Sequence, residues 1–343
     1  MSNPKVSFIV PVYNTQEFLP RCLDSLLGQT LADIEIVVVN DGSPDDSAQV
    51  IAAYAQRDKR IRVIQKPNGG LSSARNAGMD VARGEIVDFV DSDDYVEPNL
   101  AEFLAEAFER ERPEIVVFGA VCEPAELASK RIRELLSPEA RVFEPFDPEL
   151  LFCARAQPYV WRAAYARDLL ERAFLRFAQN VRFAEDVVFQ FESYPLSKKT
   201  LVMPERLYHY VMQDKSLTHV FNAGARRMDK VDAHLLVLHE VLERWDRRGL
   251  LDVCPGQTVT WFLDLIVFDL ARMPKDEARL VADRVRACFA TYLGPDWASL
   301  PLKAPVRRVA KKLDRGAGAI SLVDAVSLYL STRGLKACLE RFI

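Results

Sequence analysis

Runs of apolar, mostly β-branched residues alternate with amphipathic helical stripes along the first 120 residues of the chain. Apolar runs of this kind are typical of strands buried on both faces, and the helices between them supply the cover. The pattern predicts an α/β fold with a mainly parallel sheet and flanking helices. The predicted strands are 6–12, 34–39, 61–64, 85–90 and 114–119, and the predicted helices are about 18–29, 45–54, 71–81 and 99–112.

The pattern changes in the rest of the chain. Charges and prolines interrupt it between about 122 and 150, and a mixed segment extends to about 219. Helical spacing returns over 228–242 and 261–270. Because a chain of 343 residues corresponds to about two domains, we expect one unit over 1–220 and a helical C-terminal region over 221–343.

Composition and charge exclude several classes of protein. With 49% hydrophobic and 27% charged residues the chain is neither disordered nor fibrous, and its net charge of −4 argues against a nucleic-acid partner. The longest apolar stretch, 261–270, contains Asp264 and Asp269 and does not span a bilayer, and the N-terminal apolar run is too short for a signal peptide. The six cysteines form no C-x-x-C pair, which predicts buried thiols in a reducing, cytoplasmic compartment.

Polar side chains follow three of the predicted strands at the points where the strands end. Tyr13 and Asn14 follow the first strand, Asp41 follows the second, and Asp91 and Asp93 follow the fourth. Because ligands bind beyond the carboxyl ends of parallel strands, we expect these groups at one functional edge of the sheet. Taken singly, each cluster also fits a solvated turn or a helix cap.

Two of these features suit a phosphorylated ligand. The acidic turn at 91–94 carries three carboxylates, and Mg²⁺ or Mn²⁺ prefers such oxygen ligands and often bridges to substrate phosphates. The alternative is an exposed turn that caps a helix beginning at Tyr95. Arg75 follows a Gly-Gly turn and offers a fork of donors that matches phosphate, although a solvated arginine is equally compatible.

Four segments of the chain, in this order, resemble the family-2 glycosyltransferases of the bacterial type. They are Val10-Pro11-Val12-Tyr13-Asn14, Asn40-Asp41-Gly42-Ser43, Asn68-Gly69-Gly70-Leu71-Ser72-Ser73-Ala74-Arg75-Asn76 and Asp91-Ser92-Asp93-Asp94. The resemblance is strong over 5 to about 120 and weaker to about 220. It implies the GT-A fold, a Rossmann-like, mainly parallel sheet with flanking helices. In this fold the half formed by residues from about 5 to 120 binds the nucleotide, and the half formed by residues from about 121 to 220 faces the acceptor.

The resemblance also implies roles for single residues around a nucleotide-sugar, most simply a UDP-sugar. Each matching position is carried over separately. Pro11, Tyr13 and Asp41 match family positions around the uracil and ribose, and Arg75 matches a residue near the diphosphate. Asp91 and its neighbour Ser92 match residues that contact the nucleotide or the sugar. Asp93 matches the residue that binds Mn²⁺ or Mg²⁺. The family usually has Asp-Asp-Gly-Ser where this chain has Asn40-Asp41-Gly42-Ser43, so the second carboxylate is kept.

An acidic pair, Glu185-Asp186, lies between apolar residues in the second half of the chain. By itself it fits a favourable charge at the N-terminus of a helix. The resemblance implies instead that Asp186 is the general base and Glu185 its supporting neighbour, because a carboxylate can accept the proton of an acceptor hydroxyl. Upstream, Trp161 and Tyr165 match a family motif, and Trp161 could stack on a sugar or belong to the core.

The segment 208–219 resembles one that closes over the diphosphate in this family. Val211 stands where relatives often have an arginine, and Lys215 is the candidate replacement. His219 is the histidine that we assign to the metal. His209 is an alternative ligand, and an ordinary surface histidine is an equally good interpretation of either residue.

Basic and apolar residues interleave over 302–315, which predicts an amphipathic helix. Such a helix could lie on an anionic membrane surface, at the inner face of the cell membrane, or it could be a solvated helix or part of a homo-oligomer.

Taken together, the sequence predicts an inverting, metal-dependent glycosyltransferase of the hexosyl- or N-acetylhexosaminyl-transferring kind. The predicted acceptor is a hydroxyl of a glycan, of a lipid-linked glycan or of a cell-envelope polymer. A nucleotidyltransferase and a non-catalytic glycan-binding protein are the alternatives, and the sequence does not identify the sugar.

Overall fold

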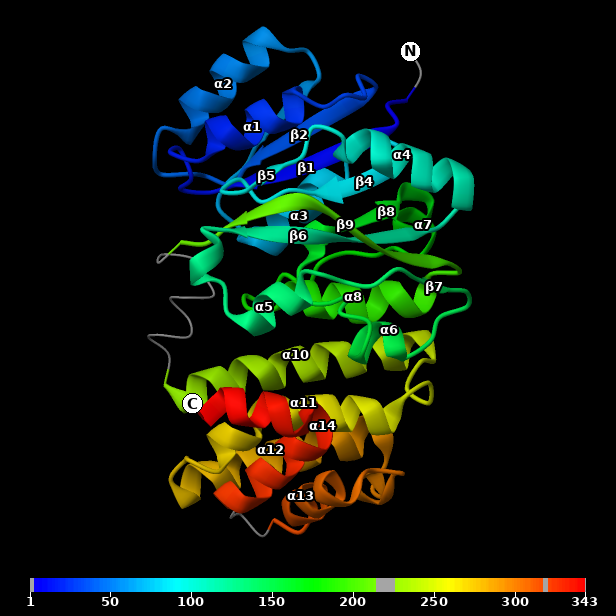
Figure 1. Cartoon of the computed structure of the whole chain (residues 1–343). Coiled ribbons are helices and arrows are strands. Elements are labelled where there is room, and N and C mark those ends of the chain that lie inside the picture. Colours follow the sequence, from blue (N-terminus) through cyan, green and yellow to red (C-terminus); the bar gives the residue numbers. More distant parts are fainter. Residues whose placement is uncertain (1–2, 214–225, 317–319, 343) are drawn as a thin grey trace. The chain divides into compact units, whose positions relative to one another are not determined.

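The computed structural model of the chain describes residues 3–213, 226–316 and 320–342. The chain divides into two compact units, Met1–Asp214 (unit 1) and Lys215–Ile343 (unit 2), which are described separately below (Figure 1). The functional roles predicted for 1–220 and 221–343 stay predictions.

Four parallel strands form the first half of the sheet in unit 1, in the order β3-β2-β1-β4. Every residue of β1 and β2 is buried, which explains why their sequences show no polar alternation. The strands predicted from the sequence are thereby confirmed. Their bounds are β1 (Val6–Val12), β2 (Ile34–Asn40), β3 (Ile61–Gln65) and β4 (Ile86–Phe89).

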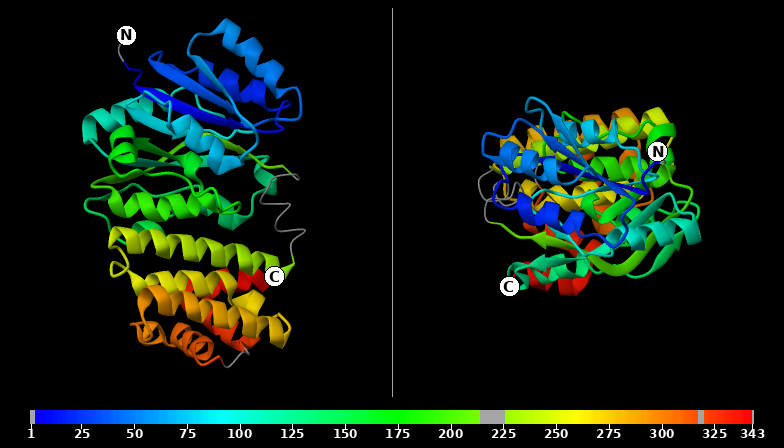
Figure 2. Two further views of the ribbon diagram at one scale, coloured as in Figure 1. Left: turned by 180° about the vertical axis from the view of Figure 1, so that it is seen from behind. Right: turned by 90° about the horizontal axis from the view of Figure 1, so that it is seen from above.

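Helices cover both faces of these strands. Helices α1 (Leu19–Leu27) and α2 (Ser47–Arg57) lie on one face, and α3 (Leu71–Met79) lies on the opposite face (Figure 1; Figure 2, left). Helix α3 approaches β1 closely at Gly78, where an added Cβ would lie 2.4 Å from Cγ2 of Ile9. The predicted helices are confirmed, as is the next one, α4 (Leu100–Glu111).

The second half of the sheet is mixed rather than parallel. Strand β8 is inserted antiparallel between β4 and β6, β9 pairs in parallel with β6, and β5 and β7 are antiparallel to β9. The irregular segment 122–150 therefore lies within the fold and contributes β7. The bounds are β5 (Tyr95–Val96), β6 (Ile115–Glu123), β7 (Arg141–Phe143), β8 (Ala163–Ala166) and β9 (Thr200–Val211).

Helix α8 (Glu185–Leu196) is fixed to the sheet by aromatic side chains. Phe189 stacks on Phe177 with a centroid separation of 4.1 Å, and it meets Phe89 of β4 and Tyr165 of β8 edge to face. Because Phe189 lies one turn after Glu185, this packing fixes the helix start. The remaining helices of unit 1 are α5 (Lys130–Leu135), α6 (Glu149–Phe152) and α7 (Arg167–Arg172), with short 3₁₀ turns at Ala125–Leu127 and Val160–Arg162.

Unit 2 is helical, as predicted. Over 226–316 and 320–342 its helices are α10 (Arg227–Arg248), α11 (Pro255–Leu270), α12 (Lys275–Leu293), α13 (Ala304–Asp314) and α14 (Leu322–Phe342), with a 3₁₀ turn at Trp297–Ser299 and a kink in α14 at Gly334. Asp264, which interrupts the apolar stretch of α11, is buried and pairs with Arg333 at 2.8 Å. Within the part of the chain that the structure describes, no helix is both long enough and apolar enough to cross a membrane.

The basic amphipathic helix predicted at 302–315 exists as α13, but its apolar side is already covered. Val306, Val309, Ala310 and Leu313 are buried in the core of unit 2. Lys312 pairs with Asp324 at 2.6 Å. A membrane contact of this helix thus stays a prediction that rests on its charged side.

The cysteines follow the prediction only in part. Cys22, Cys122, Cys254 and Cys338 are buried, whereas Cys288 is partly buried and Cys153 is exposed. Cys153 directly follows the four-residue helix α6, and its side chain is exposed although the next residue, Ala154, is buried. The expectation of buried thiols is therefore wrong for Cys153.

Candidate active site

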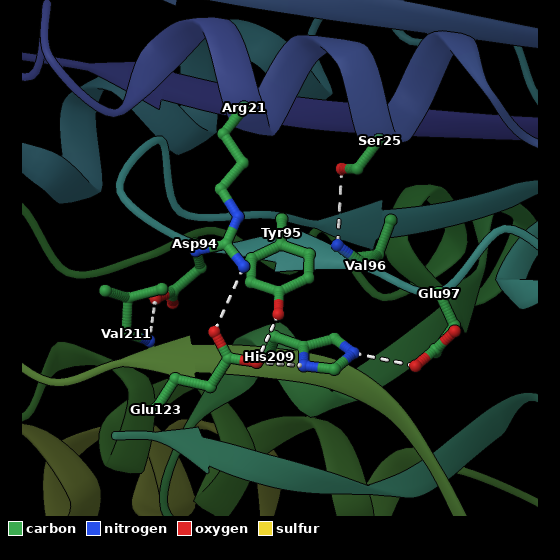
Figure 3. Close-up of polar contacts among 9 residues, drawn as sticks. All are labelled: Arg21, Ser25, Asp94, Tyr95, Val96, Glu97, Glu123, His209 and Val211. Atoms are coloured by element: carbon green, nitrogen blue, oxygen red, sulfur yellow. Dashed lines mark hydrogen bonds and ion pairs between the residues drawn. The ribbon is translucent and has the colours of Figure 1, made fainter.

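The acidic turn after β4 is tied to strand β9 at three points. The backbone N–H of Asp91 donates to the hydroxyl of Tyr208 at 3.1 Å, and that hydroxyl donates to Asp94 at 2.8 Å. The backbone N–H of Val211 donates to the other carboxylate oxygen of Asp94 at 2.7 Å (Figure 3). The chain then enters β5 at Tyr95, so the alternative of a capped helix at this residue is wrong.

The three carboxylates of the turn have different surroundings. Asp91 pairs with Arg75, and Asp94 is held by β9. Asp93 has a long contact of 3.4 Å from the amide of Gln213. Burial, together with the neighbouring charge of Asp91, raises the pKa of Asp93 to about 6.

These surroundings leave Asp93 as the carboxylate able to take a cation. Among the described residues, no group of three or more His, Cys, Asp and Glu side chains could enclose a metal ion. A site of one carboxylate completed by substrate phosphate oxygens fits Mg²⁺, which usually keeps few protein ligands. The residues present therefore fit a cation that arrives with a diphosphate, and His219 and Lys215 lie outside the described residues.

Arg75 connects the acidic turn to helix α8. Its side chain is 2% exposed, and its two terminal nitrogens lie 2.9 Å from Asp91 and 2.8 Å from Glu185. Burial by itself disfavours the charged guanidinium, but these two carboxylates raise the pKa of Arg75. The diphosphate contact predicted for Arg75 stays a prediction, because both arms of the fork face carboxylates here.

The acidic pair Glu185 and Asp186 opens helix α8, as the sequence predicted. Burial raises the pKa of Glu185 to about 7, an increase that Arg75 opposes and Asp186 reinforces. Burial also raises the pKa of Asp186, although hydrogen bonds from the backbone N–H groups of Tyr159 and Val187, each at 2.8 Å, oppose it. Both carboxyls of the pair therefore have pKa values raised by burial, which is typical of acidic residues that take part in proton transfer.

The residues predicted for the nucleoside lie at the carboxyl ends of β1 and β2. Pro11 is buried within β1, and Tyr13, directly after the strand, is 50% exposed. Asp41 is buried, and its carboxylate accepts hydrogen bonds from the backbone N–H groups of Gly69 at 3.0 Å and Gly70 at 2.8 Å. The Asn-Asp-Gly turn is thereby locked to the Gly-Gly turn that starts α3.

Two further contacts complete this end of the site. Lys66 forms an ion pair with Asp41, which the sequence analysis did not predict. Ser92 of the acidic turn shares a hydrogen bond of 2.9 Å with the hydroxyl of Thr15, just beyond β1. Side chains thus link the turn after β1 to the turn after β4, and the turn after β2 to the segment before α3.

His209 is held between two glutamates rather than exposed as an ordinary surface histidine, and its role toward a metal stays a prediction. Its Nε2 lies 2.7 Å from Glu97 and its Nδ1 lies 3.1 Å from Glu123, so both ring nitrogens are occupied (Figure 3). The ring stacks on Tyr95 at 4.1 Å, and Arg21 lies over the other face of Tyr95. This cluster fastens β5 to β9 beside the acidic turn.

Trp161 belongs to the core rather than to an open sugar-binding surface. It is 3% exposed and stacks on Tyr208 at 4.3 Å and on Tyr159 at 5.0 Å. Tyr165 is fully buried in β8. Of the two interpretations of Trp161 that the sequence allowed, the core residue is correct.

Two residues of the site gave no usable signal in the sequence. Lys66 stands before a Gly-Gly turn, where a basic residue is ordinarily solvated. Tyr159 has a φ of 77° and a ψ of 94°, a backbone conformation that aromatic residues rarely adopt. The sequence around it does not predict this conformation.

Comparisons with known proteins agree with this arrangement. The family described as glycosyl transferase family 2 matches residues 7–173. The chain is 43% identical to the uncharacterized glycosyltransferase EpsJ of Bacillus subtilis over 260 residues, which cover 73% of this chain and 72% of EpsJ. It is 27% identical to the succinoglycan biosynthesis protein ExoO of Rhizobium meliloti over 321 residues, which cover 90% of this chain and 88% of ExoO.

Solved structures show the same fold. The S. aureus TarS 1–349 complex with UDP-GlcNAc has a TM-score of 0.69 with this chain at 19% identity, covering 96% of this chain and 92% of that one. The predicted GT-A fold with a helical C-terminal region is thereby confirmed. With EpsJ 43% identical over most of both chains, this protein belongs to glycosyltransferase family 2 and is a glycosyltransferase.

Proposed function

We propose that the chain transfers a sugar from a nucleotide-sugar to a hydroxyl group of a glycan acceptor, with inversion at the anomeric carbon. The observation that carries the proposal is the bridge from Asp91 through Arg75 to Glu185. It brings the proposed base beside the acidic turn. Sugar transfer requires that a donor bound at the acidic turn and an acceptor bound at the base lie close together.

The donor lies across the ends of β1, β2 and β4 in this proposal. The nucleobase and the ribose lie near Pro11, Tyr13 and Asp41. The diphosphate lies near Ser92 and Asp93. The TarS complex with UDP-GlcNAc supports a UDP-sugar, because it holds that donor on the same fold. A hexosyl or N-acetylhexosaminyl group fits such a donor.

Asp186 is the proposed general base. It accepts the proton of the acceptor hydroxyl while that oxygen attacks the anomeric carbon from the side opposite the diphosphate. The bond between the anomeric carbon and the diphosphate oxygen breaks, and the nucleoside diphosphate leaves with the electron pair. Glu185 is the neighbouring carboxyl that connects the start of α8 to Arg75, and its pKa is raised to about 7 by burial.

Asp93 is the residue that would hold Mn²⁺ or Mg²⁺. The cation supplies positive charge that offsets the charge developing on the leaving diphosphate. The mannosyltransferase of Pyrobaculum calidifontis, solved with GDP-Man and Mn²⁺, supports such a requirement for the fold, with a TM-score of 0.50 and 17% identity. Replacement Asp93→Ala is expected to abolish transfer.

The proposed acceptor is a growing glycan, lipid-linked or part of the cell envelope. The name of ExoO, a succinoglycan biosynthesis protein, supports polysaccharide synthesis. Work at the inner face of the cell membrane follows from a lipid-linked acceptor. It would require the charged side of α13 or another surface to meet the lipid.

Donor binding tests the proposal without knowledge of the acceptor. UDP- and GDP-sugars are screened with Mn²⁺ for thermal stabilisation. A donor at one hundred times its Kd is expected to stabilise the fold by about 2.7 kcal/mol. Tyr13→Ala removes an exposed aromatic face and should weaken the stabilising donor about tenfold, whereas Phe174→Ala, at another exposed aromatic residue, should leave binding unchanged. Absence of stabilisation by every nucleotide-sugar contradicts the proposal.

A further inference from the structure

Both backbone polar groups of Tyr159 form hydrogen bonds with side chains at the start of helix α8. Its N–H donates to Asp186 at 2.8 Å, and its C=O accepts from the side-chain amide of Gln190 at 3.3 Å. Asp186 and Gln190 are one helical turn apart on α8. The φ of 77° that makes this possible costs a residue with a side chain about 1 to 3 kcal/mol, so the surrounding packing must hold Tyr159 in place.

That packing is a column of three aromatic rings. The ring of Tyr159 stacks on Trp161 at 5.0 Å and 20°, and Trp161 stacks on Tyr208 at 4.3 Å and 18°. Tyr208 in turn donates to Asp94 and accepts from the backbone N–H of Asp91. The column therefore runs from Asp186 at one end to the acidic turn at the other.

The rings of this column have little freedom to move. Trp161 and Tyr208 are buried, and the side chain of Tyr159 is largely covered. Stacked aromatic pairs of this kind contribute about 0.5 to 1.5 kcal/mol each beyond their buried area. The stacked rings therefore form a buried, packed connection between the backbone at Tyr159 and the acidic turn.

We propose that Tyr159 is a positioning residue for Asp186, and that the stacked rings of Tyr159, Trp161 and Tyr208 set the separation between this carboxylate and the acidic turn. The inference rests on the proposed function, in which Asp186 is the base and the acidic turn receives the donor. Arg75 supplies a second link between the same two places, but it binds Glu185 and leaves the orientation of Asp186 to Tyr159.

The geometry of the reaction explains why such a link matters. An acceptor oxygen must lie within hydrogen-bond distance of Asp186 and in line with the anomeric carbon, whose place is set at the acidic turn. A misplacement of about 1 Å costs about one hundredfold in rate. The hydrogen bond from Tyr159 also lowers the pKa that burial raises at Asp186, which keeps this carboxylate able to accept a proton.

The first experiment separates positioning from simple packing. Tyr159→Leu and Trp161→Leu are expected to lower kcat about one hundredfold while the Kd of the donor changes less than about twofold. Tyr159→Phe, which keeps the ring and the backbone, should rescue most of the loss. Tyr54→Leu is the matched control, because Tyr54 is also a partly buried tyrosine of unit 1 and lies on α2.

The second measurement needs no donor. Asp residues are labelled with ¹³C at the carboxyl carbon, and Asp186→Asn identifies the signal of Asp186. Tyr159→Leu is expected to shift the titration midpoint of Asp186 upward by at least about half a pH unit, because it weakens a hydrogen bond to the charged form. A midpoint unchanged from wild type overturns the inference, as does wild-type kcat in both leucine variants.

Failure of the proposed function is distinguishable from failure of this inference. A wild-type chain that binds a nucleotide-sugar and transfers it, with Tyr159→Leu equally active, refutes the positioning role alone. A wild-type chain that binds no nucleotide-sugar refutes the proposed function, and the carboxyl titration then decides by itself whether Tyr159 holds Asp186.

Discussion

Replacement of Arg75 by methionine tests the bridge between the acidic turn and helix α8. Methionine keeps much of the volume of the buried stem but removes the charge and both hydrogen-bonded nitrogens. Asp91 and Glu185 then lose their shared partner. Because the side chain of Glu185 is 10% exposed and that of Asp91 is 24% exposed, Glu185 suffers most from the loss.

The expected loss of stability is large. Removing one partner of a buried ion pair costs about 3 to 5 kcal/mol, which is a substantial part of the 5 to 15 kcal/mol that holds a typical domain folded. The pair Arg176 and Asp80 has side chains that are 42% and 59% exposed, and Arg176→Met should cost about 0 to 1 kcal/mol. The second variant is the control for loss of an arginine from unit 1.

The pH dependence of the loss gives the sharper test. The pKa of Glu185 is about 7 with Arg75 present, above that of an unfolded glutamate, so the folded state binds more protons than the unfolded state between the two values. Stability therefore falls as pH rises through this window. Without Arg75 the pKa of Glu185 rises further. At pH values above this window, each additional pKa unit lowers the free energy of unfolding by about 1.4 kcal/mol.

Equilibrium urea unfolding, followed by circular dichroism at pH 6 and pH 8, measures this difference. Arg75→Met should be least stable relative to wild type at pH 8 and should recover about half of the deficit at pH 6, where a neutral Glu185 is tolerated. Adding Glu185→Gln should restore about 2 kcal/mol at pH 8. A deficit that equals that of Arg176→Met at both pH values would falsify the reasoning.

Three further predictions concern other parts of the chain. Asp88 is buried in β4 with a pKa that burial raises well above its usual range, so the neutral variant Asp88→Asn should exceed wild type in stability at pH 8 and lose this advantage toward pH 4, as thermal melts at both pH values would show. Gly78→Ala places a Cβ 2.4 Å from Ile9 and should cost about 1 to 3 kcal/mol in urea unfolding, whereas Gly256→Ala, whose Cβ meets no atom nearer than 3.5 Å, should cost nothing. If α13 binds anionic vesicles, the bond is electrostatic because the apolar side of the helix is buried, so co-sedimentation should vanish in about 1 M salt, and binding that survives this salt would contradict the account.

The first half of the sheet could be predicted because its strands are buried on both faces. Strands β1 and β2 consist of seven residues each that all lie in the interior, so their sequences are continuous apolar runs with sharp ends. The turns that follow the strands collect the polar residues. The places of Asp41 and of the acidic turn at one sheet edge followed from this pattern.

The second half of the sheet could not be predicted in the same way. Strand β8 has the sequence Ala-Ala-Tyr-Ala, in which alanine has little preference for strands. Strand β9 is long and irregular, with exposed charged residues in its middle and shifts of register against β6. These strands form through pairing with distant segments, which local patterns do not record.

The contacts within the site could not be predicted from the sequence for a similar reason. Arg75 and Glu185 are separated by 110 positions, and each of them alone also fits a solvated residue. The position of Tyr159 depends on a strained backbone, on two stacked rings and on helix α8 together. Such a set of conditions becomes visible only in the folded chain.

The proposal that Asp186 is the base of a sugar transfer is tested most directly by comparing wild type with Asp186→Asn. The donor selected by the binding screen is supplied with Mn²⁺ and a panel of glycan acceptors, and release of free nucleoside diphosphate is measured beside the Kd of the donor. The account predicts a fall in the rate of at least about one hundredfold with an unchanged Kd. Transfer by Asp186→Asn at the wild-type rate would contradict it.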